Sequence, residues 1–214
     1  MQTIPPPAPS DEPAPREREV AAAFAADGLA RVDGFWSAAE TRGLAEEARR
    51  DQRRGTFRHA GVGRGASFRI RPEVRDDRVR WIDPARPGRR EARYLAAMEA
   101  LRRALNRELY LGLFGFEAHF ACYPPGARYR THLDRFAAAS HRVVSSVLYL
   151  NEGWRPADGG ALRLYLGEPD REPWRDVAPE GGRLVLFESG RFPHEVLPAE
   201  RERWSLVGWF TTRA

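Results

Sequence analysis

Two histidines and one aspartate are the side chains of this sequence whose types and spacing best suit chemistry. His132 and Asp134 are separated by one residue, and His194 follows later in the chain. Residues i and i+2 of a β-strand point to the same side, so an imidazole and a carboxylate at this spacing can contact one metal ion. Two neutral imidazoles and one carboxylate leave about three positions open on an octahedral ion, which suits Fe(II), O2 and a cosubstrate. The spacing therefore predicts an iron-dependent oxygenase site.

Zinc is the alternative metal, and chance is the alternative origin of the pattern. Catalytic zinc is usually four-coordinate and often bound by an HExxH helix, and the sequence contains no HExxH. A pattern as short as HxD arises freely by chance. However, runs with strand propensity flank both parts of the motif, at residues 121–126, 142–150, 183–187 and 204–210. Iron ligands on neighbouring strands are therefore the preferred interpretation.

A series of short stretches beyond the metal motif adds a family resemblance. They are ACYP (121–124), YRTHLD (129–134), YLNEGW (149–154), GGALR (159–163), DVAP (176–179), RLVLF (183–187), PHEV (193–196), PA (198–199) and RW (203–204), with the charged segment VRDDRVRWI (74–82) ahead of them. In this order they resemble the 2-oxoglutarate/Fe(II) dioxygenases. Within that superfamily they resemble the prolyl 4-hydroxylases, especially the branch of the hypoxia-factor prolyl hydroxylases and their bacterial relatives.

The resemblance implies a role for each residue that matches the family's pattern. His132, Asp134 and His194 would bind Fe(II). Arg203 would bind the distal carboxylate of 2-oxoglutarate through its guanidinium fork, with Tyr149 as its hydroxyl partner. The implied reaction consumes O2 and 2-oxoglutarate and releases succinate and CO2, with ascorbate as a stimulant. The alternatives are a solvated strand arginine for Arg203 and a plain core tyrosine for Tyr149.

Other residues of the pattern are expected to surround the two organic molecules. The cosubstrate would contact Tyr123, Leu162, Val196 and Trp209, and the substrate would contact Arg75 and Tyr129. Aromatic residues are enriched in strands for packing reasons alone, so a core role is the alternative for this group. His119 shares a strand face with Tyr123 if the strand is regular, so its ring is expected to face the same cavity. A structural histidine is an equal alternative.

The substrate implied by the resemblance is a prolyl residue in a protein or peptide, read partly by the loop at residues 61–77. A translation factor is the first expected partner, because bacterial members of this branch modify an elongation factor. An ion pair between Asp77 and Arg142 is predicted to hold the end of the loop. A hydroxylase of a free amino acid or other small molecule is one alternative, because the same iron core serves many substrates. A non-catalytic 2-oxoglutarate- or oxygen-sensing module is another.

Composition limits the remaining classes of function. The 214 residues suit one domain, and the single cysteine, Cys122, excludes an internal disulfide and a cysteine-rich metal site. The formal charge of +5 comes from 35 arginines, without a lysine, interleaved with 30 acidic residues. A nucleic-acid partner is therefore not expected. No apolar run reaches the roughly 18 residues of a membrane span, and the N-terminus lacks signal-peptide features. A cytoplasmic bacterial protein without a membrane partner is expected.

Along the chain, predicted helices come first and predicted strands later. Residues 1–18 are proline-rich and predict a disordered tail ahead of a single domain at 19–214. Helices are expected at 17–26, before Gly28, at about 38–54 after a capping box of Ser37 and Glu40, and at 89–108. A strand at 29–33 and a strand pair joined by a mobile loop at 55–78 are also expected. The short strands from Phe116 onward predict an α+β fold, in which N-terminal helices buttress a double-stranded β-helix, a jelly-roll or cupin-like core, at about 116–212.

Overall fold

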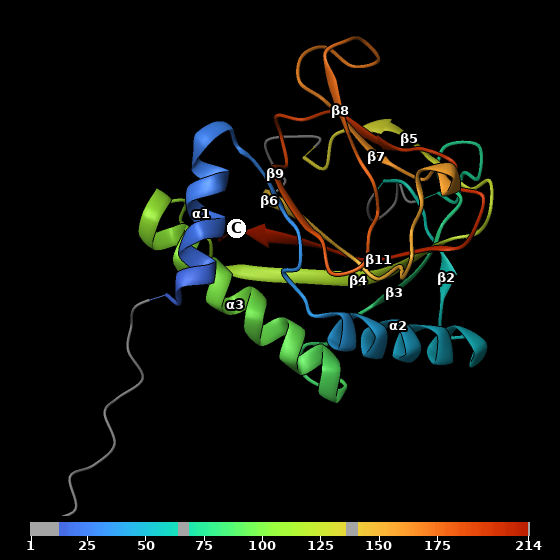
Figure 1. Ribbon diagram of the computed structural model, residues 1–214, viewed down its shortest axis with the longest axis horizontal. Helices are drawn as coiled ribbons and strands as arrows, with labels where there is room; N and C mark the ends of the chain where they lie inside the picture. Colours follow the sequence, from blue (N-terminus) through green and yellow to red (C-terminus); the bar gives the residue numbers. More distant parts are fainter. Residues whose placement is uncertain (1–12, 64–68, 136–140, 214) are drawn as a thin grey trace, which may run out of the picture.

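The computed structural model describes residues 13–63, 69–135 and 141–213. In this part of the chain a larger and a smaller antiparallel β-sheet face each other, and helices lie along the outer face of the larger sheet (Figure 1). The predicted α+β double-stranded β-helix with N-terminal helices is confirmed.

Three helices of the described chain agree closely with the sequence prediction. They are α1 (Pro15–Asp27), α2 (Ala38–Arg53) and α3 (Arg89–Leu109). Gly28 ends α1 at φ 74°, a left-handed conformation that glycine adopts without strain, and its amide donates to the Phe24 carbonyl. The capping box of Ser37 and Glu40 opens α2 as expected. The tail boundary was wrong, because residues 15–18 already belong to α1; residues 1–12 of the predicted tail lie outside the described residues.

The strands of the larger sheet lie in the order β1-β9-β6-β11-β4-β3-β2. Its strands are β1 (Leu29–Val32), β9 (Leu184–Glu188), β6 (Arg142–Tyr149), β11 (Arg203–Thr211), β4 (Gly115–Tyr123), β3 (Arg78–Trp81) and β2 (Arg58–His59). The predicted strand pair is confirmed as β2 and β3, which run antiparallel. Residues 64–68 of the loop between them, which was expected to be mobile, lie outside the described residues.

The smaller sheet faces the larger one across the second core. It contains β5 (Tyr129–His132), β10 (His194–Val196), β7 (Leu162–Tyr165) and β8 (Trp174–Val177), in the order β5-β10-β7-β8. A short 3-10 helix, η2 (Pro156–Asp158), precedes β7. Because β10 pairs with β5, two segments far apart in the sequence become neighbours.

Side chains of the larger sheet alternate between two cores. In β4, Phe120 and Cys122 pack toward the helices, whereas Ala121 and Tyr123 belong to the core between the sheets. The same alternation puts Leu148 on the helix side and Tyr149 between the sheets. Successive side chains of a strand point to opposite faces, so one strand serves both cores. The space between the sheets is where the chemistry-bearing residues meet.

Candidate active site

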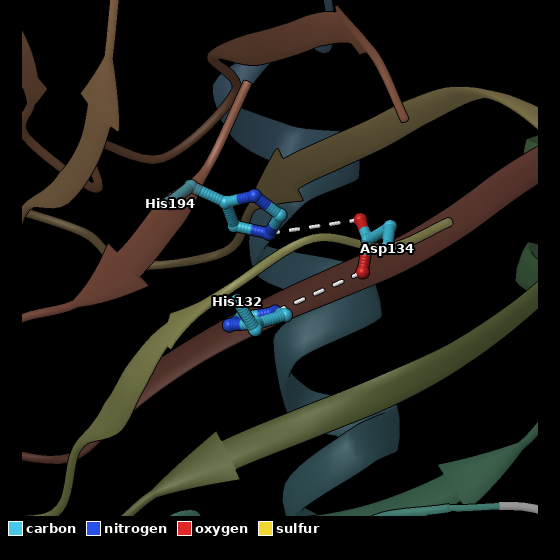
Figure 2. A group of neighbouring side chains, drawn as sticks. All are labelled: His132, Asp134 and His194. Atoms are coloured by element: carbon cyan, nitrogen blue, oxygen red, sulfur yellow. Dashed lines mark ion pairs between the residues drawn. The ribbon is translucent and has the colours of Figure 1, made fainter. Parts of the chain in front are cut away.

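The predicted metal-binding side chains converge at one end of the smaller sheet (Figure 2). His132 ends β5 and lies directly opposite His194, the first residue of β10, in the antiparallel ladder. Asp134 lies two residues beyond the end of β5, so it is a loop residue and not, as predicted, a strand residue. One ligand atom from each of the three lies within 4.8 Å of the others. This group can hold one metal ion.

Main-chain carbonyls fix how both imidazoles present their nitrogens. His132 Nδ1 lies 2.8 Å from the Arg130 carbonyl oxygen, and His194 Nδ1 lies 3.0 Å from that of Phe192. A carbonyl oxygen only accepts, so each Nδ1 carries the proton and each Nε2 keeps its lone pair. The Nε2 atoms face the Asp134 carboxylate, at 3.8 Å for His132 and 3.6 Å for His194. This is the arrangement that a metal-binding histidine requires.

Burial and neighbouring charges set the protonation states of the group. Burial, and after it the charge of His194, lowers the pKa of His132, so its imidazole is neutral at neutral pH. Burial alone would raise the pKa of Asp134, but His194, His132 and the Ser145 hydroxyl together lower it. Ser145 Oγ donates to Asp134 Oδ2 at 2.7 Å. Two imidazoles and one carboxylate are the donor set predicted for Fe(II).

A second set of residues forms an anion site deeper between the sheets. Arg203 is only 2% exposed, and its Nε donates to the Gly160 carbonyl at 2.8 Å. Its Cζ lies 5.1 Å from the Tyr149 ring centroid and 5.2 Å from that of Tyr123. No carboxylate of the described residues forms an ion pair with Arg203. A buried guanidinium without a counterion is costly, so this position suits a carboxylate brought by a bound molecule.

The Tyr149 hydroxyl fits the same purpose. It is completely buried, and within the described residues it has no hydrogen-bond partner. Burial raises the pKa of Tyr149, so the hydroxyl stays protonated and remains a donor. Gly160 makes room beside Arg203, because a Cβ at this position would lie 2.8 Å from the Cβ of Ala199 and 3.3 Å from the Cδ of Arg203. The GGALR stretch therefore allows the arginine to pack closely.

A cavity of about 1300 Å³ joins the metal-binding group to the surface. Its wall includes the three metal-binding residues, Arg203 and all the other residues predicted to contact cosubstrate or substrate except Tyr149: Tyr123, Leu162, Val196, Trp209, Arg75 and Tyr129. Tyr149 is not part of the wall, and its ring centroid lies 5.1 Å from Arg203 Cζ.

Comparisons with known proteins decide the family. A model of the 2OG-Fe(II) oxygenase superfamily matches residues 118–211. The crystal structure of a Pseudomonas putida prolyl-4-hydroxylase is 46% identical, superposes with a TM-score of 0.81, and matches over 92% of this chain and 100% of its own. The chain belongs to the 2OG-Fe(II) oxygenase superfamily. It is a prolyl-hydroxylase-like member, and its cofactors are Fe(II) and 2-oxoglutarate, as predicted.

Two of the other relatives have hypoxia-inducible factor in their names, and a third is named Egl nine homolog 1. The Caenorhabditis elegans hypoxia-inducible factor prolyl hydroxylase is 31% identical over 198 residues, which are 87% of this chain and 27% of that protein. Human Egl nine homolog 1 is 33% identical over 144 residues, which are 64% of this chain and 33% of that protein. The chain therefore spans about a quarter to a third of these two proteins. The Trichoplax adhaerens prolyl hydroxylase in complex with a hypoxia-inducible factor peptide is 26% identical, with a TM-score of 0.80, over 92% of this chain and 90% of its own.

The charged residues near the mouth of the oxygenase cavity correct one prediction. Asp77 is fully buried and pairs with Arg75, whose Nη2 lies 2.9 Å from Asp77 Oδ2. Arg142 instead pairs with Glu117 at 2.7 Å and lies over the Trp209 ring. The predicted Asp77–Arg142 ion pair is therefore wrong. Asp77 nevertheless holds the segment before β3, through an arginine two residues away.

Arg75 also connects this ion pair to the metal-binding group. Its Cζ lies 4.6 Å from the Tyr129 ring centroid, and residues 75 and 129 form an isolated β-bridge. The Tyr129 ring stacks on the His132 ring, with centroids 3.6 Å apart. The two residues predicted to contact substrate thus lie between the surface segment and a metal-binding histidine.

His119 faces the cavity, as strand alternation predicted. Its ring lies between Trp81 and Trp209, with centroid distances of 4.8 Å and 5.4 Å. Neither ring nitrogen has a hydrogen-bond partner within the described residues. Burial, and after it the charges of Arg75 and Arg142, lowers the pKa of His119 well below its usual value. The imidazole is therefore neutral, and its hydrogen-bonding capacity is unused.

The sequence interpretation missed several residues of the β6 and β11 faces. Ser145 orients Asp134 and shares a 2.9 Å hydrogen bond with Ser189, whereas Val147 and Val207 form apolar cavity wall. The signal was present, because Ser145, Val147 and Tyr149 alternate along one strand, and Tyr149 was already expected to face the cosubstrate.

A search of the helices in the described part of the chain finds none with the length and hydropathy of a membrane span.

Proposed function

We propose that this oxygenase hydroxylates a prolyl residue in a protein or peptide and releases succinate and CO2. The observation that carries the proposal is the cavity, which runs from exposed residues such as Arg58 and Trp81 to His132 and His194. A bound amino acid would need only a small enclosed space, whereas a cavity of about 1300 Å³ that reaches the surface leaves room for a longer chain. The prolyl hydroxylases among its relatives support the same substrate class.

In this proposal His132, Asp134 and His194 are the iron ligands. Bound Fe(II) would supply the activation of O2 that makes attack on an unreactive C–H bond possible. The protein keeps the ligands in the required state: the carbonyls of Arg130 and Phe192 fix both imidazoles, and Ser145 orients the carboxylate. These contacts hold the three side chains in the orientation that a metal ion requires.

The cosubstrate is held at its distal end by Arg203 and Tyr149. The arginine provides the positive charge. The tyrosine hydroxyl, which has no hydrogen-bond partner among the described residues, donates a hydrogen bond. The wall around the remaining carbon atoms is formed by Tyr123, Leu162, Val196 and Trp209. Apolar wall residues exclude water from the reacting centre and so limit turnover that is not coupled to hydroxylation.

Arg75 and Tyr129 position the peptide near the metal. The Asp77 carboxylate holds Arg75, and the Arg75 guanidinium lies over the Tyr129 ring. Since Tyr129 also stacks on His132, a peptide that contacts Tyr129 lies next to the metal-binding group.

The test is anaerobic loading with Fe(II) and 2-oxoglutarate, followed by exposure to O2 with a panel of proline-containing peptides. We expect metal-dependent succinate release and a gain of one oxygen atom on proline, located by tandem mass spectrometry. Free proline and other free amino acids form the second arm. Hydroxylation of a free amino acid in preference to every peptide would contradict the proposal, and the absence of succinate release would indicate a binding module.

A further inference from the structure

Charges on the cavity wall are strongly one-sided. The wall contains the arginines Arg58, Arg71, Arg75, Arg80, Arg142 and Arg203. In its described part the one acidic residue is Asp134, which belongs to the metal-binding group. The whole chain, by contrast, contains 35 basic and 30 acidic residues. A cavity of this composition favours a negatively charged occupant beyond the cosubstrate.

Three of these arginines are neutralised by carboxylates behind the wall. Arg75 pairs with Asp77, Arg142 pairs with Glu117, and Arg80 pairs with Asp51 at 3.3 Å and with Glu91. These ion pairs stabilise the wall and leave little net charge for a ligand. Arg203 lies deep in the cavity, where 2-oxoglutarate requires it.

Arg58 and Arg71, at the mouth, are different. Both are exposed, and neither forms an ion pair with a carboxylate of the described residues. Arg58 donates to the carbonyl oxygens of Gly55 and Phe57, which orient the side chain without neutralising its charge. The backbone of Arg71 is fixed, because its carbonyl accepts the amides of Val74 and Arg75 at 2.9 Å each. Two arginines that no carboxylate of the described residues neutralises therefore line the exposed end of the cavity, one with an oriented side chain and one with a fixed backbone.

We infer that this mouth binds acidic side chains of the peptide substrate, so that the preferred target proline is flanked by aspartate or glutamate. The inference rests on the proposed peptide substrate and names its charge. A guanidinium fork matches a carboxylate in shape as well as in charge. Because the pairs are solvent-exposed, they contribute modestly to affinity but raise the association rate, and salt weakens them. The selectivity is therefore expected to be moderate and salt-dependent.

The experiment compares peptide pairs that differ only at the residues flanking proline, aspartate or glutamate in one and asparagine or glutamine in the other. At an ionic strength of about 20 mM, we expect kcat/KM to favour the acidic peptide roughly threefold to tenfold. The preference should shrink at about 200 mM, where the Debye length is short. The double variant Arg58→Gln/Arg71→Gln should lose most of the preference.

A matched control removes the same kind of charge elsewhere. Arg175 on β8 is exposed and is not part of the cavity wall, so Arg175→Gln should keep the preference for the acidic peptide. Succinate release without peptide should be the same in all variants, because none of these arginines lies in the metal or cosubstrate site.

The outcomes separate this inference from the proposed function. Equal kcat/KM for the acidic and amide peptides at low salt would overturn the inference and leave prolyl hydroxylation intact. Metal-dependent succinate release without hydroxylation of any proline peptide would overturn the proposed function. A single-stranded oligonucleotide that binds more tightly than the acidic peptide, and that the double variant no longer binds, would assign the mouth to phosphate and overturn the inference.

Discussion

The two faces of the larger sheet have opposite contents, although the same strands form both. Toward the helices, β4, β6 and β11 present large apolar side chains such as Phe120, Leu148 and Leu206, packed into one core. Toward the smaller sheet, the same strands present His119 and Arg203 to an open cavity. The helix-facing side stabilises the sheet, and that stability allows the other side to hold polar groups without partners. Substitutions on the first face should therefore change stability, and substitutions on the second should change chemistry.

The largest effect is expected at the metal-binding group. His194→Ala removes one of three proposed protein ligands, and it should abolish Fe(II)-dependent succinate release and weaken Fe(II) binding. Thermal unfolding without metal should be little changed, because the imidazole faces the cavity. Isothermal titration with Fe(II) under anaerobic conditions and a succinate assay test both points. His141→Ala is the control, since His141 is not part of the cavity wall; full activity of His194→Ala would refute the assigned ligand set.

The opposite face predicts a different result for Leu148→Ala. Leu148 is fully buried in the helix-facing core, and removing a buried leucine side chain costs about 2–5 kcal/mol. KM for 2-oxoglutarate of the folded variant should remain that of the wild type. Val147, the preceding residue, faces the cavity, so Val147→Ala should cost less stability and change KM instead. Urea unfolding and steady-state kinetics of the pair test the comparison, which fails if both variants alter KM equally.

Strand alternation is also what made the site predictable from sequence. The HxD spacing, the parity of His119 with Tyr123 and the family's stretches placed nearly every predicted residue on one cavity wall. Strand alternation correctly predicted that Asp134 joins the metal-binding group, but for a wrong reason. Strand β5 ends at His132, and the loop after it brings the carboxylate to the histidines. The start of α1 was missed because proline-rich composition suggested disorder, although proline is favoured at the first position of a helix.

Ion-pair partners were the part that sequence reasoning could not supply. Asp77 was assigned to Arg142, but Arg75 is two residues away and is brought onto the same carboxylate by the local backbone. In a chain with 35 arginines, several guanidinium groups can reach any one carboxylate, and the choice depends on tertiary geometry. Neither periodicity nor propensity reports that geometry.

Arg203→Lys is expected to have an intermediate effect on the cavity face. Lysine keeps the charge but loses the planar fork and the Nε donor to the Gly160 carbonyl. Hydrogen bonds to charged groups contribute about 1.5–3 kcal/mol, so KM for 2-oxoglutarate should rise roughly tenfold to a hundredfold. Fe(II) affinity should be nearly unchanged, because Arg203 is not in the metal-binding group. Tyr149→Phe should raise the same KM less, and an unaltered KM in both variants would place the distal carboxylate elsewhere.

The smallest effect concerns His119 and the pH dependence of stability. Burial and the charges of Arg75 and Arg142 lower the pKa of His119 in the folded protein, against the weaker opposite influence of Asp134. Below pH of about 6.5 the unfolded chain binds a proton at this histidine that the folded protein does not, so stability falls as the pH falls. Above that pH the residue is neutral in both states and contributes no slope.

His119→Phe should remove this pH-dependent loss and keep the aromatic contacts with Trp81 and Trp209. Urea titration gives the free energy of unfolding at pH 7.5 and at pH 5.5. The loss between these two pH values should be about 1 kcal/mol smaller for His119→Phe than for the wild type. Other histidines cancel in this difference, and His59→Phe, at an exposed position, should leave the wild-type dependence unchanged. An identical loss in wild type and His119→Phe would mean that the imidazole gains a partner in solution and is no longer a neutral, unpaired group on the cavity face.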